Sequence, residues 1–332
     1  MKASGQPHFA RAHARSSLTV NPSILVTGSA GFIGKRALQR LSGTGHNLVA
    51  MYHERLPDSL PGIFPTACDM SSSDLLATPL RGVSTVVHLA WSLEHHNPKT
   101  EDLPFDHKTP FVDLPLNVQK TLNLIKAMEL AGTKRLVFIS PLATSPKGKI
   151  RFLREKYWSE FFILNSKIPE KIILRLPAVF GNGEINDRAS QSVLRMMNFP
   201  ALYPIPKEKI HIPFLHVEDA ATIIANSCFT QFQETNIVLS YPSNEPLNFS
   251  ELFRSMTKSL GKPNKLPVSG PLGSLITSFL EKKINQDPVN ISLQNLLVLS
   301  QPKEKSSQKD DSTIFLELIP EPQISYKDLF RP

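Results

Sequence analysis

Residues 24–34 read ILVTGSAGFIG, and this stretch decides the fold of the chain. An apolar, β-branched run ends in a glycine-rich turn, and apolar residues then recur at helical spacing. Gly28 allows a tight turn off the strand, Gly31 lets a pyrophosphate approach the backbone, and Gly34 lets the helix pack closely. The helix N-terminus adds free N–H groups and a positive dipole end. The stretch predicts a dinucleotide-binding turn; the alternative is an ordinary glycine-rich turn between strand and helix.

Composition limits the class of protein. The 332 residues suffice for one large domain, or for one domain with a smaller lobe. Cys68 and Cys228 make no disulfide framework and favour a reducing compartment, which we expect to be the cytoplasm. No apolar run is long enough to span a membrane. The net charge of +8 suits phosphorylated small molecules. Without a basic stripe interleaved with aromatic residues, we expect neither a nucleic-acid nor a membrane partner.

The first acidic residue is Glu54, and residues 1–20 contain Arg, Ser and Ala but no acid. This composition is typical of an organelle-targeting segment, and the alternative interpretation is a flexible leader over residues 1–22.

Strands and helices are predicted to alternate along the chain. Apolar runs at 47–52, 63–67, 85–90, 135–140 and 171–175 indicate strands, and helical patterns cover 114–131, 149–165 and 217–228. This alternation predicts an α/β fold with a doubly wound parallel sheet of Rossmann type. We expect a flexible leader, a dinucleotide-binding domain over 23–240 with 181–212 partly in a substrate lobe, and the smaller C-terminal substrate lobe over 241–332.

The second predicted strand ends in Tyr52, followed by His53, Glu54 and Arg55. An acidic residue at this strand tip would hold the ribose 2′-hydroxyl of NAD. Positive groups follow instead, and Lys35 and Arg36 begin the first helix. We therefore expect NADP in preference to NAD, with Arg55 at the 2′-phosphate; alternatively these are surface charges, or Glu54 takes the ribose.

Two further features bear on ligands. Asp69 follows the third predicted strand, where it could hold the adenine amino group. The polar stretch 92–113 contains His95, His96 and His107, but no Cys, Asp or Glu lies at ligand spacing on a regular element. We therefore expect no metal site.

Five ordered motifs between about residues 23 and 230 together resemble the extended short-chain dehydrogenase/reductase family, the NAD-dependent epimerase/dehydratase group. Residues 27–34 are similar to its TGxxGFIG signature, and residues 88–90 to its HLA segment. Its N-V-x-G-T-x-N-L helix is matched by residues 117–124, except that Lys120 stands where Gly is usual. The remaining two, LRxxxVYG and FVHVDDVA, resemble residues 174–181 and 214–221.

The resemblance implies a set of cofactor-binding residues and a homodimer. The cofactor set is Gly28, Ala30, Gly31, Phe32, Ile33, Gly34, Leu89, Ala90, Lys156 and Pro177. In the proteins that this sequence resembles, the helices matching 114–131 and 149–165 pair across a two-fold axis. Tyr157, Trp158, Phe161 and Phe162 supply apolar surface for such pairing.

The chain departs from the family at its catalytic residues. The family uses Tyr-x-x-x-Lys on a helix together with a Ser or Thr hydroxyl; Lys156 matches the lysine, but Phe152 stands in place of the tyrosine. Tyr157 is turned about 100° around the helix from Lys156, which makes it a poor substitute. The hydroxyl position falls at Leu142. Thr144 or Ser145 could replace it if the loop at Pro141 shifts.

Two functions follow from these residues. One is an NADP- or NAD-dependent oxidoreductase or epimerase that acts on a small carbonyl or hydroxyl compound or a nucleotide sugar. Its proton would come from water, Lys156, Glu184 or Asp187. The other is a non-catalytic dinucleotide-binding regulator or scaffold that has kept the fold and lost the chemistry.

Overall fold

A computed structural model describes residues 23–92, 104–148, 150–181, 211–212, 214–242, 247–248 and 317–319. The predicted leader and most of the predicted substrate lobe lie outside the described residues. So do His95, His96, Glu184 and Asp187.

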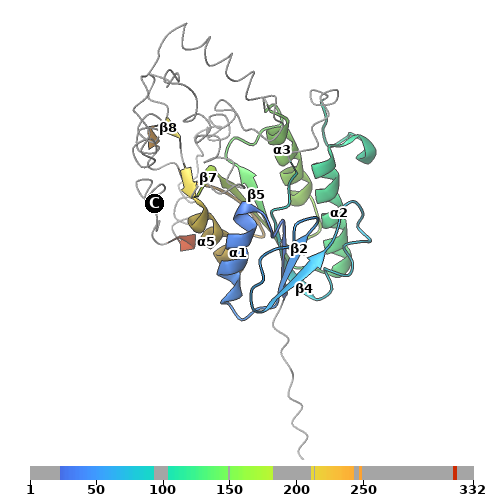
Figure 1. Cartoon of the computed structure of the whole chain (residues 1–332). Helices are drawn as coiled ribbons and strands as arrows, with labels where there is room; N and C mark the ends of the chain where they lie inside the picture. The colour runs from blue at the N-terminus through green and yellow to red at the C-terminus, as the bar shows by residue number, and fades with distance from the viewer. Residues whose placement is uncertain are drawn as a thin grey trace, which may run out of the picture.

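One seven-stranded sheet forms the centre of the molecule (Figure 1). The strand order is β10-β6-β5-β4-β1-β2-β3, and every pair is parallel. The strands are β1 (Ser23–Thr27), β2 (Leu48–Tyr52), β3 (Ile63–Ala67), β4 (Val83–His88), β5 (Arg135–Pro141), β6 (Glu170–Leu176) and β10 (Asn236–Ser240). The predicted α/β fold with a Rossmann-type parallel sheet is confirmed.

Helices cover both faces of the sheet. On one face α1 (Phe32–Ser42) packs against α5 (Val217–Ser227), and on the other α2 (Leu116–Ala131) packs against α3 (Arg151–Leu164) (Figure 1). Successive strand residues therefore enter different cores: Ile24 and Val26 face α1 and α5, whereas Leu25 faces α2. Because both faces of the sheet are covered there, the central strands β1, β4 and β5 are almost continuously buried rather than buried on alternate residues.

The order of the strands fixes where a ligand can bind. The chain leaves β1 toward β2 and β3 on one side, and it then crosses to β4, β5 and β6 on the other. The chain segments after β1 and β4 therefore continue to helices on opposite faces of the sheet, which makes the carboxyl ends of these two strands the switch point where ligands bind in such sheets.

Several helices and strands begin or end at residues other than the predicted ones. The strand predicted over 85–90 ends at His88, because the N–H groups of Leu89 and Ala90 donate to the Thr27 hydroxyl instead of to a neighbouring strand. Helix α2 begins after Pro115, and Gly132 ends it in the left-handed conformation at φ 71°. Strand β10 was not predicted; it pairs with β6 at the sheet edge.

Smaller elements complete the described part. A 3₁₀ turn covers Phe111–Asp113. β7 (Ala178–Phe180) pairs with β9 (Phe214–His216), and β8 (His211–Ile212) pairs with β11 (Leu247–Asn248). Leu318 and Ile319, from the segment predicted as the substrate lobe, are buried in the core on the α1 and α5 face of the sheet, where Asn226 of α5 donates to the Leu318 carbonyl.

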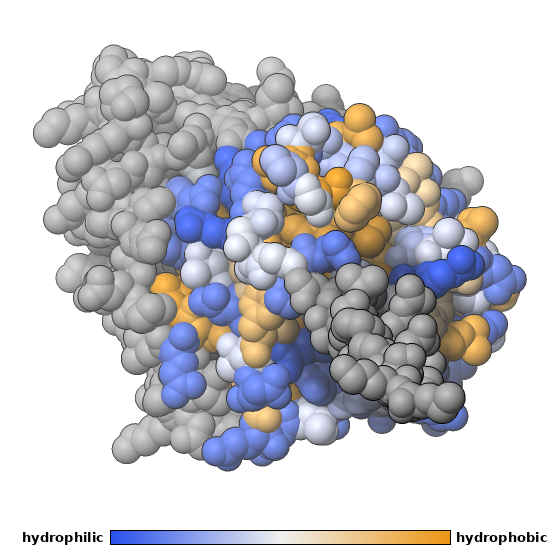
Figure 2. Space-filling view, turned by 90° about the horizontal axis from the view of Figure 1, so that it is seen from below, coloured by the Kyte–Doolittle hydropathy of each residue, from blue (hydrophilic) through white to orange (hydrophobic). Residues whose placement is uncertain are grey.

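Apolar and hydrophilic residues share the described surface. On the face shown in Figure 2, apolar residues gather in small patches between hydrophilic ones. No helix within the described ranges is both long and apolar enough to cross a membrane.

Candidate functional site

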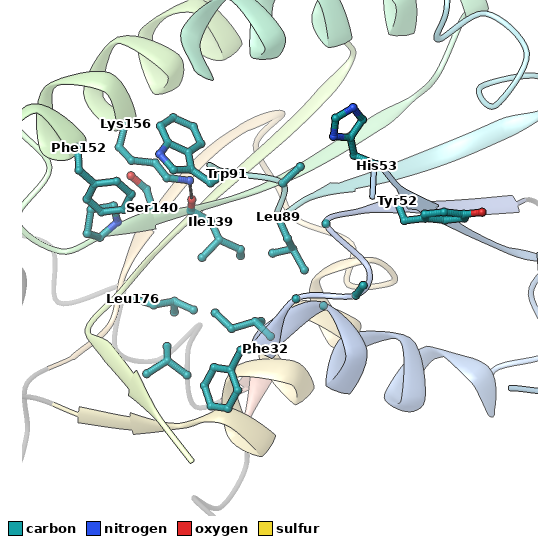
Figure 3. Close-up of a pocket in the computed structure, with 18 of the residues that line it drawn as sticks. Phe32, Tyr52, His53, Leu89, Trp91, Ile139, Ser140, Phe152, Lys156 and Leu176 are labelled. Atoms are coloured by element: carbon teal, nitrogen blue, oxygen red, sulfur yellow. Dashed lines mark hydrogen bonds between the residues drawn. The ribbon is translucent and has the colours of Figure 1, made fainter. Parts of the chain in front are cut away.

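A cavity of about 590 Å³ lies at the carboxyl ends of β1, β2, β4, β5 and β6 (Figure 3). Twelve residues predicted for the site line it: Gly28, Ala30, Gly31, Phe32, Ile33, Gly34, Arg55, Leu89, Ala90, Phe152, Lys156 and Pro177. Residues not predicted for the site also line it, among them Tyr52, Trp91, Ile139, Ser140, Pro141 and Leu176. The cavity occupies the crevice at the switch point of the sheet.

The glycine turn forms one wall, and its glycines are required by the backbone itself. Gly28 adopts φ +66°, and a Cβ there would lie 2.7 Å from the Ala90 nitrogen. A Cβ on Gly34 would lie 2.2 Å from the Gly28 carbonyl oxygen. The interpretation that Gly34 serves helix–sheet packing therefore needs correction, because Gly34 makes room for the turn. Gly31 caps α1, so the first N–H groups of the helix face the cavity side of the turn.

A buried hydrogen-bond chain joins the ends of β1 and β4 below this turn. The Thr121 hydroxyl donates to the Asn117 carbonyl at 2.9 Å, so at the 3.2 Å contact between them His88 Nε2 donates to Thr121 Oγ1. His88 Nδ1 then accepts from the Thr27 hydroxyl at 2.8 Å. Burial, with the Lys156 charge nearby, lowers the pKa of His88 to about 3, so its ring is neutral. This hydrogen-bond chain holds Leu89 and Ala90 against the glycine turn.

The tip of β2 carries Tyr52, His53, Glu54 and Arg55, all on the cavity. The exposed Glu54 carboxylate lies 3.6 Å from His53 Nδ1. Of the basic residues expected to gather there, Arg55 lines the cavity and Lys35 and Arg36 do not. Arg36 lies 3.5 Å from Glu218 and over the Phe32 ring, because α1 presents that side chain to α5.

Asp69 is not on the cavity. Its carboxylate lies 3.7 Å from Lys120 Nζ and accepts from the Ser71 N–H, since the chain turns away from the sheet after β3. The adenine contact of Asp69 therefore stays a prediction.

Lys156 lies at the inner end of the cavity, where α3 crosses β5 (Figure 3). Its Nζ donates to the Ile139 carbonyl at 2.8 Å and lies 3.8 Å from the ring centre of Trp91. Lys156 is only 6% exposed to solvent. Burial lowers the pKa of Lys156 from 10.5 to about 7, and the charges of Glu160 and Glu155 oppose that shift. A group with this pKa can give and take a proton near neutral pH.

Phe152 lies one helical turn before Lys156 and also lines the cavity. Its ring stands edge-on to Trp91, with 5.9 Å between centroids and 89° between planes. The side chain at this position has no proton to transfer. Tyr157 is not on the cavity and packs against Trp158.

Of the three hydroxyl residues at the end of β5, Ser140 lines the cavity and Thr144 and Ser145 do not. The Thr144 hydroxyl donates to the Pro141 carbonyl at 2.7 Å, so at the 2.8 Å contact between the two hydroxyls Ser140 is the donor. Ser145 Oγ instead accepts from the Lys147 N–H. The backbone turn after β5 points both predicted side chains inward, and Leu142 is buried as well. Ser140 thus offers a ligand an acceptor rather than a donor.

Trp91 and Ser140 were the functional residues that sequence reasoning missed. Both lie next to predicted features: Trp91 comes directly after the HLA segment, and Ser140 is the last residue of the strand predicted over 135–140. No cluster of three or more His, Cys, Asp or Glu side chains that could hold a metal occurs within the described ranges.

Comparison with known proteins finds one family model and several distant relatives. Residues 24–158 match the model of the NAD dependent epimerase/dehydratase family. The chain spans only about a quarter of the first curated relatives that it matches, which are uncharacterized mycobacterial proteins 24% identical over 262 residues. A UDP-glucose 4-epimerase of Vibrio cholerae is 23% identical over 275 residues, which cover 74% of this chain and 78% of that protein.

Solved structures support the fold. A nucleoside-diphosphate-sugar epimerase of Staphylococcus aureus aligns with a TM-score of 0.65 at 15% identity, covering 93% of this chain and 100% of the other. A dTDP-glucose 4,6-dehydratase of Bacillus anthracis, solved in complex with NAD, aligns with a TM-score of 0.59 at 14% identity, covering 93% and 94%. Structural homologues therefore bind NAD. Residues 24–158 are thus similar to the NAD-dependent epimerase/dehydratase family.

Proposed function

We propose that the protein is an NAD(P)-dependent oxidoreductase or epimerase whose acid/base residues differ from those of its family. Its substrate would be a small carbonyl or hydroxyl compound or a nucleotide sugar. One observation carries the proposal: a lysine that can exchange a proton near neutral pH lies in the same cavity as a glycine turn at a helix N-terminus. A hydride carrier and a proton carrier are the two parts that such a reaction needs.

The cavity fits a dinucleotide. Gly31 lines the cavity, and a Cβ there would lie 3.0 Å from the Gly28 carbonyl oxygen; the pyrophosphate would approach at this glycine. The N–H groups at the start of α1 would hold its charge. When bound, the dinucleotide supplies the hydride acceptor or donor.

The preferred cofactor would be NADP. Arg55 and His53 line the cavity at the β2 tip, where a 2′-phosphate would lie, and Glu54 is next to His53. An arginine binds a phosphate through two parallel hydrogen bonds, which a ribose hydroxyl cannot match.

The proton would move at Lys156 Nζ. Phe152 contributes shape without a proton, and the Ser140 hydroxyl already donates to Thr144. In a carbonyl reduction the Lys156 ammonium would donate to the developing alkoxide, and Ser140 Oγ would accept a hydrogen bond from the substrate or the cofactor.

A non-catalytic dinucleotide-binding regulator is the second candidate. It is favoured by the Phe152 ring in place of a phenol and by the Trp91 indole over the Lys156 ammonium. In that case the cavity would bind the cofactor as a signal of the redox state.

We further propose a cytoplasmic homodimer without nucleic-acid or membrane partners. The α2 and α3 helices would pair, although His107 packs on Trp158 and Phe161 and covers part of the aromatic surface of α3. Residues 23–240 would form the dinucleotide domain and residues 241–332 most of the substrate lobe.

The test has two steps. Purified protein is titrated with NADPH, followed by the fluorescence of the nicotinamide, with Gly31→Val as the variant expected to lose binding. Turnover is then measured with nucleotide sugars and simple aldehydes and ketones for the natural protein and for Lys156→Met. We expect binding by the natural protein and turnover that requires Lys156. Binding without turnover of any compound would favour the regulator, and no binding would refute both functions.

A further inference from the structure

Three aromatic rings surround the ammonium group of Lys156. Its Nζ lies 3.8 Å from the ring centre of Trp91, 4.4 Å from that of Phe138 and 5.9 Å from that of Phe152. All three distances are within the range at which the negative face of a ring attracts a cation. The Ile139 carbonyl accepts one Nζ hydrogen at 2.8 Å (Figure 3). These contacts replace part of the hydration that burial removes from the ammonium.

We propose that Trp91, Phe138 and Phe152 form an aromatic cage that binds Lys156 as an ammonium ion, and that Trp91 is the positioning residue of this cage. The inference deepens the proposed function, on which it rests, because that function needs a protonated Lys156. It also gives Phe152 a role: the ring that stands where the family has a tyrosine packs against Trp91 and faces the ammonium.

Hydrogen bonds fix the backbone directly after Trp91. The Asn117 side chain makes two hydrogen bonds to the backbone of Ser92: its Oδ1 accepts from the Ser92 N–H at 3.0 Å, and its Nδ2 donates to the Ser92 carbonyl at 2.8 Å. The same Nδ2 donates to Glu155 at 2.9 Å, and Arg151 donates to the other Glu155 oxygen at 2.8 Å. Helices α2 and α3 thus fix the residue after Trp91 through a buried carboxylate.

The Trp91 indole N–H is buried and makes no hydrogen bond among the described residues. A hydrogen bond would be the usual reason for the orientation of a buried indole. The ring is therefore oriented by its packing on Phe138, Phe152 and the Lys156 ammonium.

The other charged or titratable groups near Lys156 have hydrogen-bond partners of their own. On α3, Glu160 accepts from Arg175, and Glu155 accepts from Arg151 and Asn117. On β4, His88 is neutral and its two ring nitrogens are hydrogen-bonded to Thr27 and Thr121. The three rings thus stabilise the ammonium form of Lys156 in addition to the two carboxylates.

The decisive comparison is between Trp91→Leu and Trp91→Phe. Both remove the indole and keep an apolar side chain, but only phenylalanine keeps an aromatic face. The pKa of Lys156 is measured from the pH dependence of its acetylation by acetic anhydride, read by mass spectrometry of the peptide. Exposed Lys126 on α2 serves as the internal reference.

The cage predicts that the pKa of Lys156 is lower in Trp91→Leu than in Trp91→Phe by about one unit. Phe152→Leu, whose ring is farther from Nζ, lowers it by less. Equal pKa values in the two Trp91 variants would overturn the proposal. If a Trp91 variant does not fold, as judged by its thermal melting curve, the same comparison is made between Phe152→Leu and Phe152→Tyr, and equal values there overturn it too. Labelling needs no cofactor, so a protein that shows the cage but no turnover would refute the proposed enzyme and not the cage.

Discussion

Replacing Thr27 by valine tests the hydrogen-bond chain that supports the cavity. Valine keeps the shape of threonine and removes its hydroxyl. That hydroxyl donates to His88 Nδ1 at 2.8 Å and accepts the N–H groups of Leu89 and Ala90 at 3.1 and 3.0 Å. Three polar groups would lose their partner at once.

The magnitude follows from how well each group is buried. His88 is 1% exposed, so its Nδ1 has no access to water, and leaving a buried acceptor unpaired costs about 1–3 kcal/mol. Leu89 and Ala90 line the cavity, where water can replace part of their lost hydrogen bond. We therefore expect Thr27→Val to lower the free energy of unfolding by about 2–4 kcal/mol, a large share of the roughly 5–15 kcal/mol typical of a domain.

Thr27→Ser is the matched control, because it keeps the hydroxyl and removes one methyl group. Its cost should be about 1 kcal/mol. Urea unfolding followed by circular dichroism measures both variants against the natural protein. If Thr27→Val were as stable as Thr27→Ser, the hydrogen-bond chain through Thr27 and His88 would not stabilise the fold.

Three further predictions concern the site and the assembly. Arg55→Ala should weaken NADPH binding about ten- to a hundred-fold, because it removes a charge-assisted hydrogen bond, and it should leave NADH binding unchanged in the same fluorescence titration. Glu54→Gln is the neighbouring control. Equal losses for both cofactors in Arg55→Ala would contradict the NADP preference. Phe152→Tyr should leave turnover unchanged or lower it, since Lys156 already supplies the proton, and steady-state rates that rise by about a hundred-fold or more would mean that the missing phenol limits the reaction. Light scattering at micromolar concentration should give the mass of a dimer, and a monomer would exclude pairing through α2 and α3.

The pH dependence provides a last prediction. Burial lowers the pKa of Lys156 to about 7, so its donating, protonated form is lost as the pH rises through that value. The rate of carbonyl reduction should therefore fall on the alkaline side, and the cage shifts the midpoint upward. A rate that rises steadily with pH through this range would exclude Lys156 as the proton donor.

The sequence by itself determined the fold class, because its signals are local. The turn at 24–34 needs glycine at Gly28 and Gly34 for backbone reasons that hold in any protein with this turn. Apolar runs of the right length predicted the strands, and their alternation with helical patterns predicted a doubly wound parallel sheet. The glycine turn, together with the strand before it and the helix after it, predicted a dinucleotide site, and Gly28, Gly31 and Gly34 line the cavity.

Only the tertiary structure decided which polar side chains meet in the cavity. Thr144, Ser145 and Asp69 are near the right strands in sequence, but backbone turns after β5 and β3 direct them to Pro141, Lys147 and Lys120. Trp91 reaches Lys156 from a segment 65 positions earlier, a contact that no local pattern encodes. Distances between such residues arise from the packing of helices on the sheet, and so do the burial and the proton affinity of Lys156.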